Sequence, residues 1–181
     1  FRRVAIALIL PIVFCMFAGC GNKKDTDKRS VISVTNSWLE CTVRDVGGDD
    51  FRIARLLPPG HCPGHFDLSP RQLKDIRHSS VLLRFHFQAC MDSSFVGVMP
   101  DDSELYSITI GEGQCLPETY LASSKEVVEK LSARLPGETS RFEEGFADLE
   151  LRMKELSGKA LSMAEEAGLN ELSALCSVHQ A

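Results

Sequence analysis

The stretch from Ser140 to about Ala167 constrains the fold most, because apolar residues recur there every three or four positions. The recurring residues are Phe142, Phe146, Leu149, Met153, Leu156, Ala160 and Met163. This period predicts one amphipathic helix, roughly 40 Å long at 1.5 Å per residue. Ser140 and Glu143 have capping-box spacing, and Gly168 follows where a terminal glycine belongs. A dimeric coiled-coil arm is the alternative, but a single seam without flanking charge pairs favours packing across a globular body.

Upstream of this helix, short β-branched or alternating segments take turns with helical ones. We expect strands at residues 31–35, 51–56, 81–85 and 105–110. We expect helices at 37–46, from Ser69-Pro70 onward, and from Ser123 or Ser124 to Leu135, with a short helix or turn within 88–98. Strands that alternate with helices predict an α/β fold with a parallel sheet and right-handed crossovers. Residues 172–178, LSALCSV, return to strand character after the long helix.

The segment from Leu56 to Pro70, LLPPGHCPGHFDLSP, lies between a predicted strand and a predicted helix. Its prolines and glycines prevent the continuation of either element. It also carries imidazole, thiol and carboxylate groups, which bind borderline metal ions in proteins. A loop of this kind at the end of a strand is where open α/β domains place their sites. A tight turn with incidental histidines is the alternative interpretation.

Four potential metal ligands follow predicted strands: His65, His86, Glu118 and His179. They are far apart in sequence, but a parallel sheet brings the carboxyl ends of its strands together. A zinc or manganese site needs ligands that converge in this way. His61 is a further candidate ligand, whereas any single histidine outside such a cluster is better explained as a non-ligand. His78 is expected to cap the carboxyl end of its helix instead.

The first residues have the pattern of an export signal. Arg2 and Arg3 precede an apolar run at residues 4–17, which is short for a membrane span. The run ends in Phe17-Ala18-Gly19-Cys20, which resembles a bacterial lipobox. We therefore expect a signal peptide at 1–19, lipidation of Cys20 and a flexible tether at 20–30, and hence a location in the cell envelope. An ordinary secretory signal or a membrane anchor is the alternative.

Export places the cysteines in an oxidising compartment. Cys62 could serve as a metal thiolate, but in an exported protein a disulfide is favoured, with Cys115 as the best partner. Five cysteines follow Cys20, so at least one stays free or pairs outside this chain. The chain starts at Phe1 without a methionine and stops at Ala181, which we interpret as a fragment at both ends.

The net charge of −5 disfavours nucleic-acid binding. The sequence contains no nucleophile elbow, phosphate-binding glycine loop, paired CxxC or HExxH motif. We therefore expect no enzyme activity and no organic cofactor.

Together these features resemble the substrate-binding lipoproteins of bacterial zinc and manganese ABC importers. The resemblance rests on LLPPG with a nearby histidine, the SP-x-x-LK helix start, the long helix, and a strand that ends Val178-His179-Gln180-Ala181. It implies a lobe at residues 31–138, a bridging helix at 139–168 and the start of a truncated second lobe at 169–181. It also implies a monomer that delivers a divalent metal ion to an importer permease.

The resemblance assigns the metal ligands His65, Glu118 and His179, with an acidic fourth ligand beyond Ala181. His86 and His61 stay secondary candidates. Two features depart from the family pattern: Gly64 separates Pro63 from His65, and Glu118 stands where a histidine is usual. The carboxylate makes the site harder and leans toward manganese or iron. A siderophore- or corrinoid-binding protein and a structural or adhesion lipoprotein are the alternatives.

Overall fold

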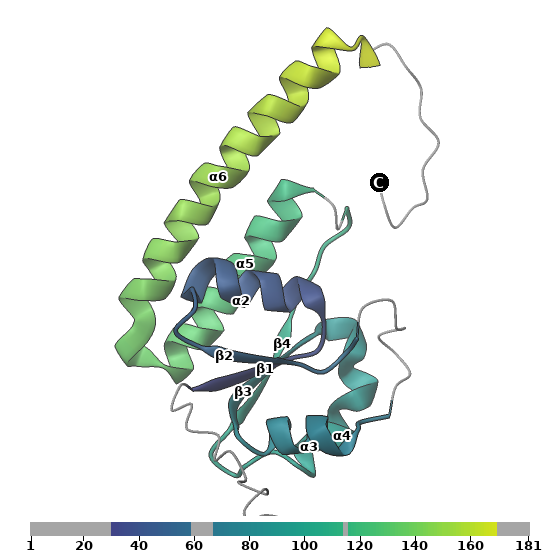
Figure 1. Cartoon of the computed structure of the whole chain (residues 1–181), viewed down its shortest axis with the longest axis vertical. Helices are drawn as coiled ribbons and strands as arrows, with labels where there is room; N and C mark the ends of the chain where they lie inside the picture. Colours follow the sequence, from purple (N-terminus) through teal and green to yellow (C-terminus); the bar gives the residue numbers. More distant parts are fainter. Residues whose placement is uncertain (1–29, 59–66, 114–115, 170–181) are drawn as a thin grey trace, which may run out of the picture.

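The computed structural model describes residues 30–58, 67–113 and 116–169, and these form a parallel four-stranded sheet (Figure 1). The strand order is β2-β1-β3-β4, and every neighbouring pair is parallel. The strands are β1 Val31–Val34, β2 Arg52–Arg55, β3 Ser79–Phe85 and β4 Glu104–Ile108. All four lie within a residue or two of the predicted positions, so the predicted α/β class with a parallel sheet is confirmed.

Helices cover both faces of the sheet (Figure 1). One face carries α2 (Ser37–Gly47), α5 (Pro117–Arg134) and α6 (Thr139–Glu166), and the other carries α3 (Pro70–Ile76), the 3-10 helix η1 (His86–Met91) and α4 (Asp92–Val96). A short 3-10 turn, η2 (Pro136–Glu138), joins α5 to α6. Each face has its own apolar core, the larger one centred on residues such as Leu39, Leu83 and Phe142, and the smaller one on Leu82 and Phe95.

Polar side chains set the starts of the first two helices. The side chain of Asn36 accepts a hydrogen bond from the Leu39 backbone N–H and caps α2. Ser69 and Gln72 form a reciprocal capping box at α3, with Pro70 at the first helical position. Both starts agree with the sequence. At the other end of α3, the His78 ring nitrogen Nδ1 lies 2.7 Å from the Lys74 carbonyl oxygen, as expected of a terminal cap.

The predicted start of α5 is wrong by about two turns. The helix begins at Pro117 rather than at Ser123 or Ser124, because proline is well suited to a first helical position. Both serines are buried within the helix, and the Ser123 hydroxyl donates to the Tyr120 carbonyl oxygen. The earlier start places Glu118 in the first turn of α5.

The long helix α6 is present, but its first turn differs from the prediction. It starts at Thr139, so Ser140 lies inside the helix, and no side chain caps its amino end. The expected capping box of Ser140 and Glu143 is therefore absent. The η2 turn leads directly into α6. Gly168 adopts a φ of 67° after the last turn, in agreement with the predicted terminal glycine.

The apolar seam of α6 is buried only along its first half. Phe142 and Leu149 are fully buried against α2 and α5, whereas Leu156 is 56% and Met163 is 69% exposed. Figure 1 shows the second half of α6 extending past the sheet and its helices. The expectation that the whole helix packs across a globular body thus holds for the first half only, within the described residues. No described helix combines the length and apolar character needed to cross a membrane.

Candidate metal centre

The carboxyl ends of the four strands lie along one edge of the sheet, here called the carboxyl edge, where Val34, Arg55, Phe85 and Ile108 end their strands. The chain leaves β1 toward β2 on one side, and β3 lies on the other side of β1. The strand order therefore reverses between β1 and β3. In open parallel sheets, ligands bind outside the carboxyl ends at such a reversal.

The loop rich in histidine and proline starts at the carboxyl edge. The backbone N–H groups of Leu56 and Leu57 donate to the carbonyl oxygens of Val34 and Thr35, both at 2.9 Å. Leu56 and Leu57 are almost completely buried. The strand pairing thus continues two residues beyond β2 and holds the loop against the end of β1.

The far end of the loop returns to the same place. The Gln72 side-chain amide donates to the Leu56 carbonyl oxygen, and its carbonyl accepts from the Ser69 N–H. One glutamine therefore joins the end of the loop to its start. His61, Cys62 and His65 belong to this loop but lie outside the described residues. Their assignment stays a prediction, although both anchors of their loop are at the carboxyl edge.

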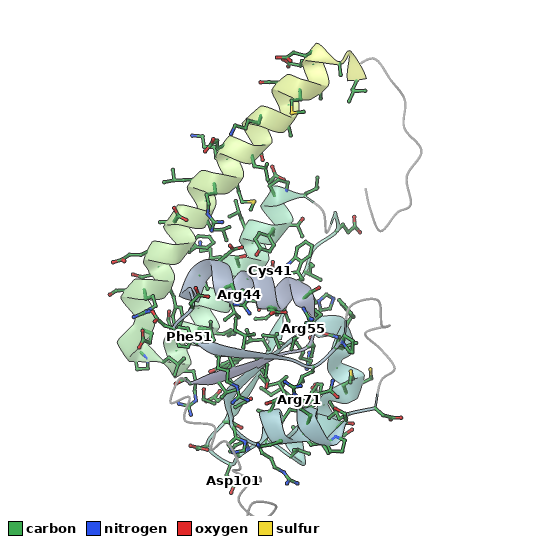
Figure 2. The ribbon with its side chains drawn as sticks, viewed as in Figure 1. Cys41, Arg44, Phe51, Arg55, Arg71 and Asp101 are labelled. Atoms are coloured by element: carbon green, nitrogen blue, oxygen red, sulfur yellow. The ribbon has the colours of Figure 1, made fainter. Side chains whose placement is uncertain are left out.

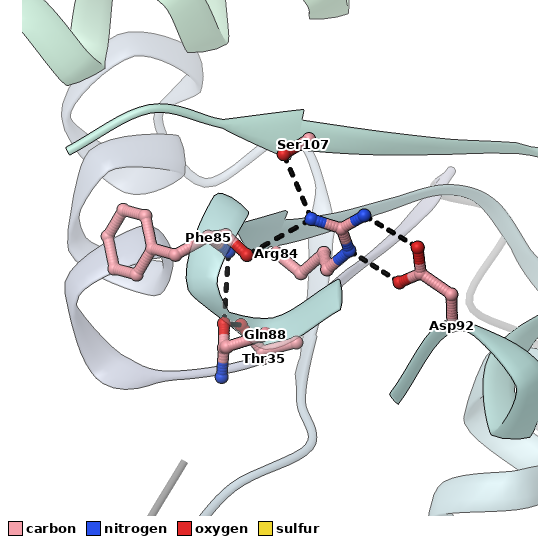
Figure 3. Close-up of polar contacts among 6 residues, drawn as sticks. All are labelled: Thr35, Arg84, Phe85, Gln88, Asp92 and Ser107. Carbon is pink, nitrogen blue, oxygen red and sulfur yellow. Dashed lines mark hydrogen bonds and ion pairs between the residues drawn. The ribbon is translucent and has the colours of Figure 1, made fainter. Parts of the chain in front are cut away.

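A buried hydrogen-bond network stabilises the carboxyl edge between β1 and β3 (Figure 3). The Thr35 hydroxyl donates to Gln88 Oε1 at 2.7 Å, and the Phe85 backbone N–H donates to the same oxygen at 3.0 Å. Thr35 and Gln88 are both 0% exposed. Since a buried amide without partners is costly, this arrangement fixes the path of the chain as it leaves β3.

Arg84 fixes the same segment from the other face of the sheet (Figure 3). Its guanidinium donates to both carboxylate oxygens of Asp92, at 2.5 and 2.6 Å, and to the Ser107 hydroxyl at 2.9 Å. It also donates to the Phe85 carbonyl oxygen. Paired, planar contacts of this kind are among the stronger charged hydrogen bonds. Arg84, on β3, therefore ties the start of α4 to β3 and β4, a role that the sequence did not indicate.

His86 occupies the position between these two networks. It is the first residue of η1 and is exposed. Its ring lies edge-on to the Phe87 ring, with centroids 5.7 Å apart, and Phe87 is itself 48% exposed. No hydrogen bond from the described residues engages the imidazole. His86 is thus an accessible nitrogen donor on a rigid support at the carboxyl edge.

Glu118 is exposed in the first turn of α5, the helix that follows β4. Two hydrogen bonds connect the start of α5 to the preceding loop. The Leu116 N–H donates to the Gly113 carbonyl oxygen, and the Thr119 hydroxyl donates to the Glu112 carbonyl oxygen. Within the described residues no hydrogen bond or ion pair uses the Glu118 carboxylate. A carboxylate also interacts favourably with the amino end of a helix, which is the structural alternative to a ligand role.

Among the described residues, no group of three or more histidine, cysteine, aspartate or glutamate side chains is arranged to hold a metal ion. The structure thus places two candidates, His86 and Glu118, after the adjacent strands β3 and β4. Cys20, Cys115 and His179 lie outside the described ranges, so lipidation, the Cys62–Cys115 disulfide and the third ligand stay predictions. Cys41 and Cys90 are free and exposed.

A further polar contact joins α2, α5 and α6, the three helices that cover one face of the sheet. The Tyr120 hydroxyl donates to Asp45 Oδ2 at 2.6 Å, and Arg152 donates to Asp45 Oδ1 at 3.2 Å. Burial, followed by the hydrogen bond to the Asp45 carboxylate, raises the pKa of Tyr120 well above its ordinary value. The contact links α2, α5 and α6 beside an open groove whose wall includes Trp38 and Cys41.

The described architecture has the fold of known periplasmic metal-binding proteins. The periplasmic zinc-binding protein TroA from Treponema pallidum aligns with a TM-score of 0.62 at 17% identity, over 76% of this chain and 56% of that chain. A Mn-bound periplasmic metal-binding protein from Candidatus Liberibacter asiaticus aligns with a TM-score of 0.64 at 9% identity, with the same two coverages. ZnuA aligns with a TM-score of 0.62 at 16% identity, over 71% of this chain and 56% of that chain.

These likenesses concern the fold, because the sequence identities are low. The chain spans about half the length of these solved chains, 56% in each case. No family model matches the sequence, and no curated protein matches it. The fold resemblance inferred from the sequence is thereby confirmed.

Proposed function

We propose that this protein captures a divalent metal ion, zinc or manganese, outside the cytoplasmic membrane and passes it to the permease of an ABC importer. One observation carries the proposal: the histidine-containing loop is anchored at both of its ends to the sheet edge that also presents His86. In an open parallel sheet, such an edge brings ligands from separate strands together. The solved proteins of the same fold include zinc-binding and Mn-bound examples.

The proposed ligands are His65, Glu118 and His179, with His86 and His61 as further candidates. Imidazole nitrogen and carboxylate oxygen suit zinc and manganese, and no redox chemistry is asked of the ion. Glu118 supports this assignment because its carboxylate is exposed and uses no other described partner. The metal is the transported substrate, so we propose no catalytic role.

The proposed location is the cell envelope, with the protein anchored as a monomer through a lipid on Cys20. The segment 20–30 would then act as a flexible tether that lets the carboxyl edge reach a membrane-embedded permease.

Metal content after dialysis tests the proposal. The purified full-length protein, equilibrated with zinc or manganese and then dialysed, should retain about one ion, as a site with several protein ligands does. We expect His65→Ala and Glu118→Gln to reduce the retained metal strongly. His78→Ala is the matched control, because the His78 ring already contacts the Lys74 carbonyl oxygen and should not contribute.

A protein that retains neither ion would contradict the proposal and favour the structural or adhesion alternative. Retention that His78→Ala abolishes and His65→Ala does not would place the metal away from the carboxyl edge. Tight binding of an iron siderophore or a corrinoid, without binding of the bare ions, would favour the other alternative.

A further inference from the structure

A groove separate from the carboxyl-edge ligands runs between strand β2 and helix α3. Its volume is about 820 Å³. The strand side is formed by residues 52–55 together with Val31, and the helix side by Ser69, Arg71, Gln72, Lys74, Asp75 and His78. A strand and a helix thus form the two walls of one open channel. None of these side chains is a proposed metal ligand, although Ser69 and Gln72 also anchor the histidine-containing loop.

The groove is strongly basic, although the chain as a whole has a net charge of −5. Arg52 and Arg55 already form ion pairs of 2.6 Å with Asp75 and Glu40, respectively. Arg71 and Lys74, in contrast, are exposed, and no carboxylate of the described residues pairs with either. Figure 2 labels Arg55 on β2 and Arg71 on α3. Two cations one helical turn apart therefore face solvent along the helix wall.

The strand wall offers backbone hydrogen bonds. Within the described residues β2 pairs with β1 alone. The N–H groups of Arg52 and Leu56 donate to β1-side carbonyl oxygens. Because backbone groups alternate along a strand, Ile53 and Arg55 direct theirs to the free side. An unpaired strand edge beside a helix is the geometry that accepts an added strand from another chain.

We propose that this groove binds an extended acidic segment of a partner protein as an added strand alongside β2. Its backbone pairs with Ile53 and Arg55, and its carboxylates contact Arg71 and Lys74. The preceding segment of this chain, residues 21–30, is a poor occupant because its four basic residues outnumber its two acidic ones. A compact anion is a less suitable occupant, because two of the cations in the groove, Arg52 and Arg55, already have carboxylate partners. An extended peptide can in addition form hydrogen bonds with the backbone edge of β2.

Fluorescence anisotropy with a labelled peptide tests this inference. The probe is a peptide of alternating Glu and Val, about eight residues long, enough to exceed β2 at 3.3 Å per residue. We expect saturable binding to the full-length protein, weakened about tenfold or more by Arg71→Glu with Lys74→Glu. Lys125→Glu with Lys154→Glu is the matched control: both are exposed helical lysines, and the net charge changes equally.

A second probe separates strand addition from attraction between charges. A peptide of the same sequence with N-methylated alternate amides keeps every carboxylate but cannot pair with β2, and it should bind at least about tenfold more weakly. Equal binding of both peptides would overturn the proposal, as would equal weakening by the two double variants. Competition by inorganic phosphate or by phosphatidylglycerol vesicles at equal charge concentration would likewise assign the groove to compact anions or lipid and overturn it.

Discussion

Thr35 and Gln88 are 53 positions apart in the sequence, yet their side chains form a fully buried hydrogen bond of 2.7 Å between β1 and the segment after β3. Gln88 Oε1 also accepts from the Phe85 N–H. Gln88 Oε1 therefore accepts two hydrogen bonds, whereas the Thr35 hydroxyl donates one to it and accepts a longer one, 3.4 Å, from the Asn36 amide. Replacement of Gln88 should therefore destabilise the protein more than replacement of Thr35.

Gln88→Leu should lower the free energy of unfolding by about 2–3 kcal/mol, because the buried Thr35 hydroxyl and the buried Phe85 N–H both lose their shared acceptor. Thr35→Val should cost only about 1 kcal/mol, since the Gln88 oxygen keeps its backbone donor. Thr35→Ser retains the hydroxyl and is the control. Urea unfolding followed by circular dichroism measures all three. Equal losses for Gln88→Leu and Thr35→Val would contradict the shared-acceptor arrangement.

Helix α6 provides a matched pair of glycines. A methyl group on Gly145 would overlap the backbone of Val46, where α6 crosses the end of α2, whereas one on Gly158 meets nothing within 4 Å. Gly145→Ala should therefore destabilise the protein by about 1–3 kcal/mol. Gly158→Ala should stabilise the same helix by up to about 1 kcal/mol. Thermal unfolding distinguishes them, and equal shifts would show that the helices do not approach this closely.

The raised pKa of Tyr120 predicts the direction in which stability changes with pH. Below pH 10.0, the ordinary pKa of tyrosine, Tyr120 is neutral in both the folded and the unfolded protein, and its contribution to stability is fully present. Above that pH the unfolded chain ionises first, so stability falls as the pH rises toward the higher folded pKa. Asp45→Asn removes the adjacent negative charge and should lower the Tyr120 pKa.

Ultraviolet titration measures this change directly. The chain has two tyrosines, so Tyr106→Phe leaves Tyr120 as the only signal. An unchanged titration midpoint in Asp45→Asn would mean that burial alone raises the pKa of Tyr120.

Lipidation is tested by fractionation of cells that express the full-length protein. Cys20→Ser should move the protein from the membrane fraction to the soluble fraction and remove the mass of the lipid. Cys41→Ser should change neither, because Cys41 is a free thiol on the folded domain. Membrane association that survives Cys20→Ser, with no lipid detected on the wild-type protein, would refute the anchor.

Much of the fold could be predicted because local chemistry and tertiary packing agree. Asn36, Ser69 and Pro70 mark helix starts by their own hydrogen bonds and fixed φ, and the β-branched strands are buried as expected. The start of α5 was wrong because two buried serines resemble caps in sequence. Pro117, six positions earlier, supplies the actual first turn.

The support of the candidate site was not predictable from the sequence. Gln88 was assigned to a short helix or turn, and nothing local shows that its partner, Thr35, lies directly after β1. The bidentate contact of Arg84 with Asp92 depends on how β3 and β4 pair, which is a long-range property. The apolar seam of α6 is a further case: its period predicts a helix, but it does not predict how much of that helix packs against other elements.

The central claim is that a divalent metal binds at the carboxyl edge, and nuclear magnetic resonance with Mn²⁺ tests it most directly. Substoichiometric Mn²⁺, which is paramagnetic, is added to the ¹⁵N-labelled full-length protein, and the broadening of each amide signal is recorded. We predict strong broadening at Thr35, His86 and Glu118, reversed by zinc. Ser79, at the amino end of β3 and about 20 Å from His86 along the strand, should stay sharp. Broadening that is strongest at Ser79, or uniform along β3, would contradict the account.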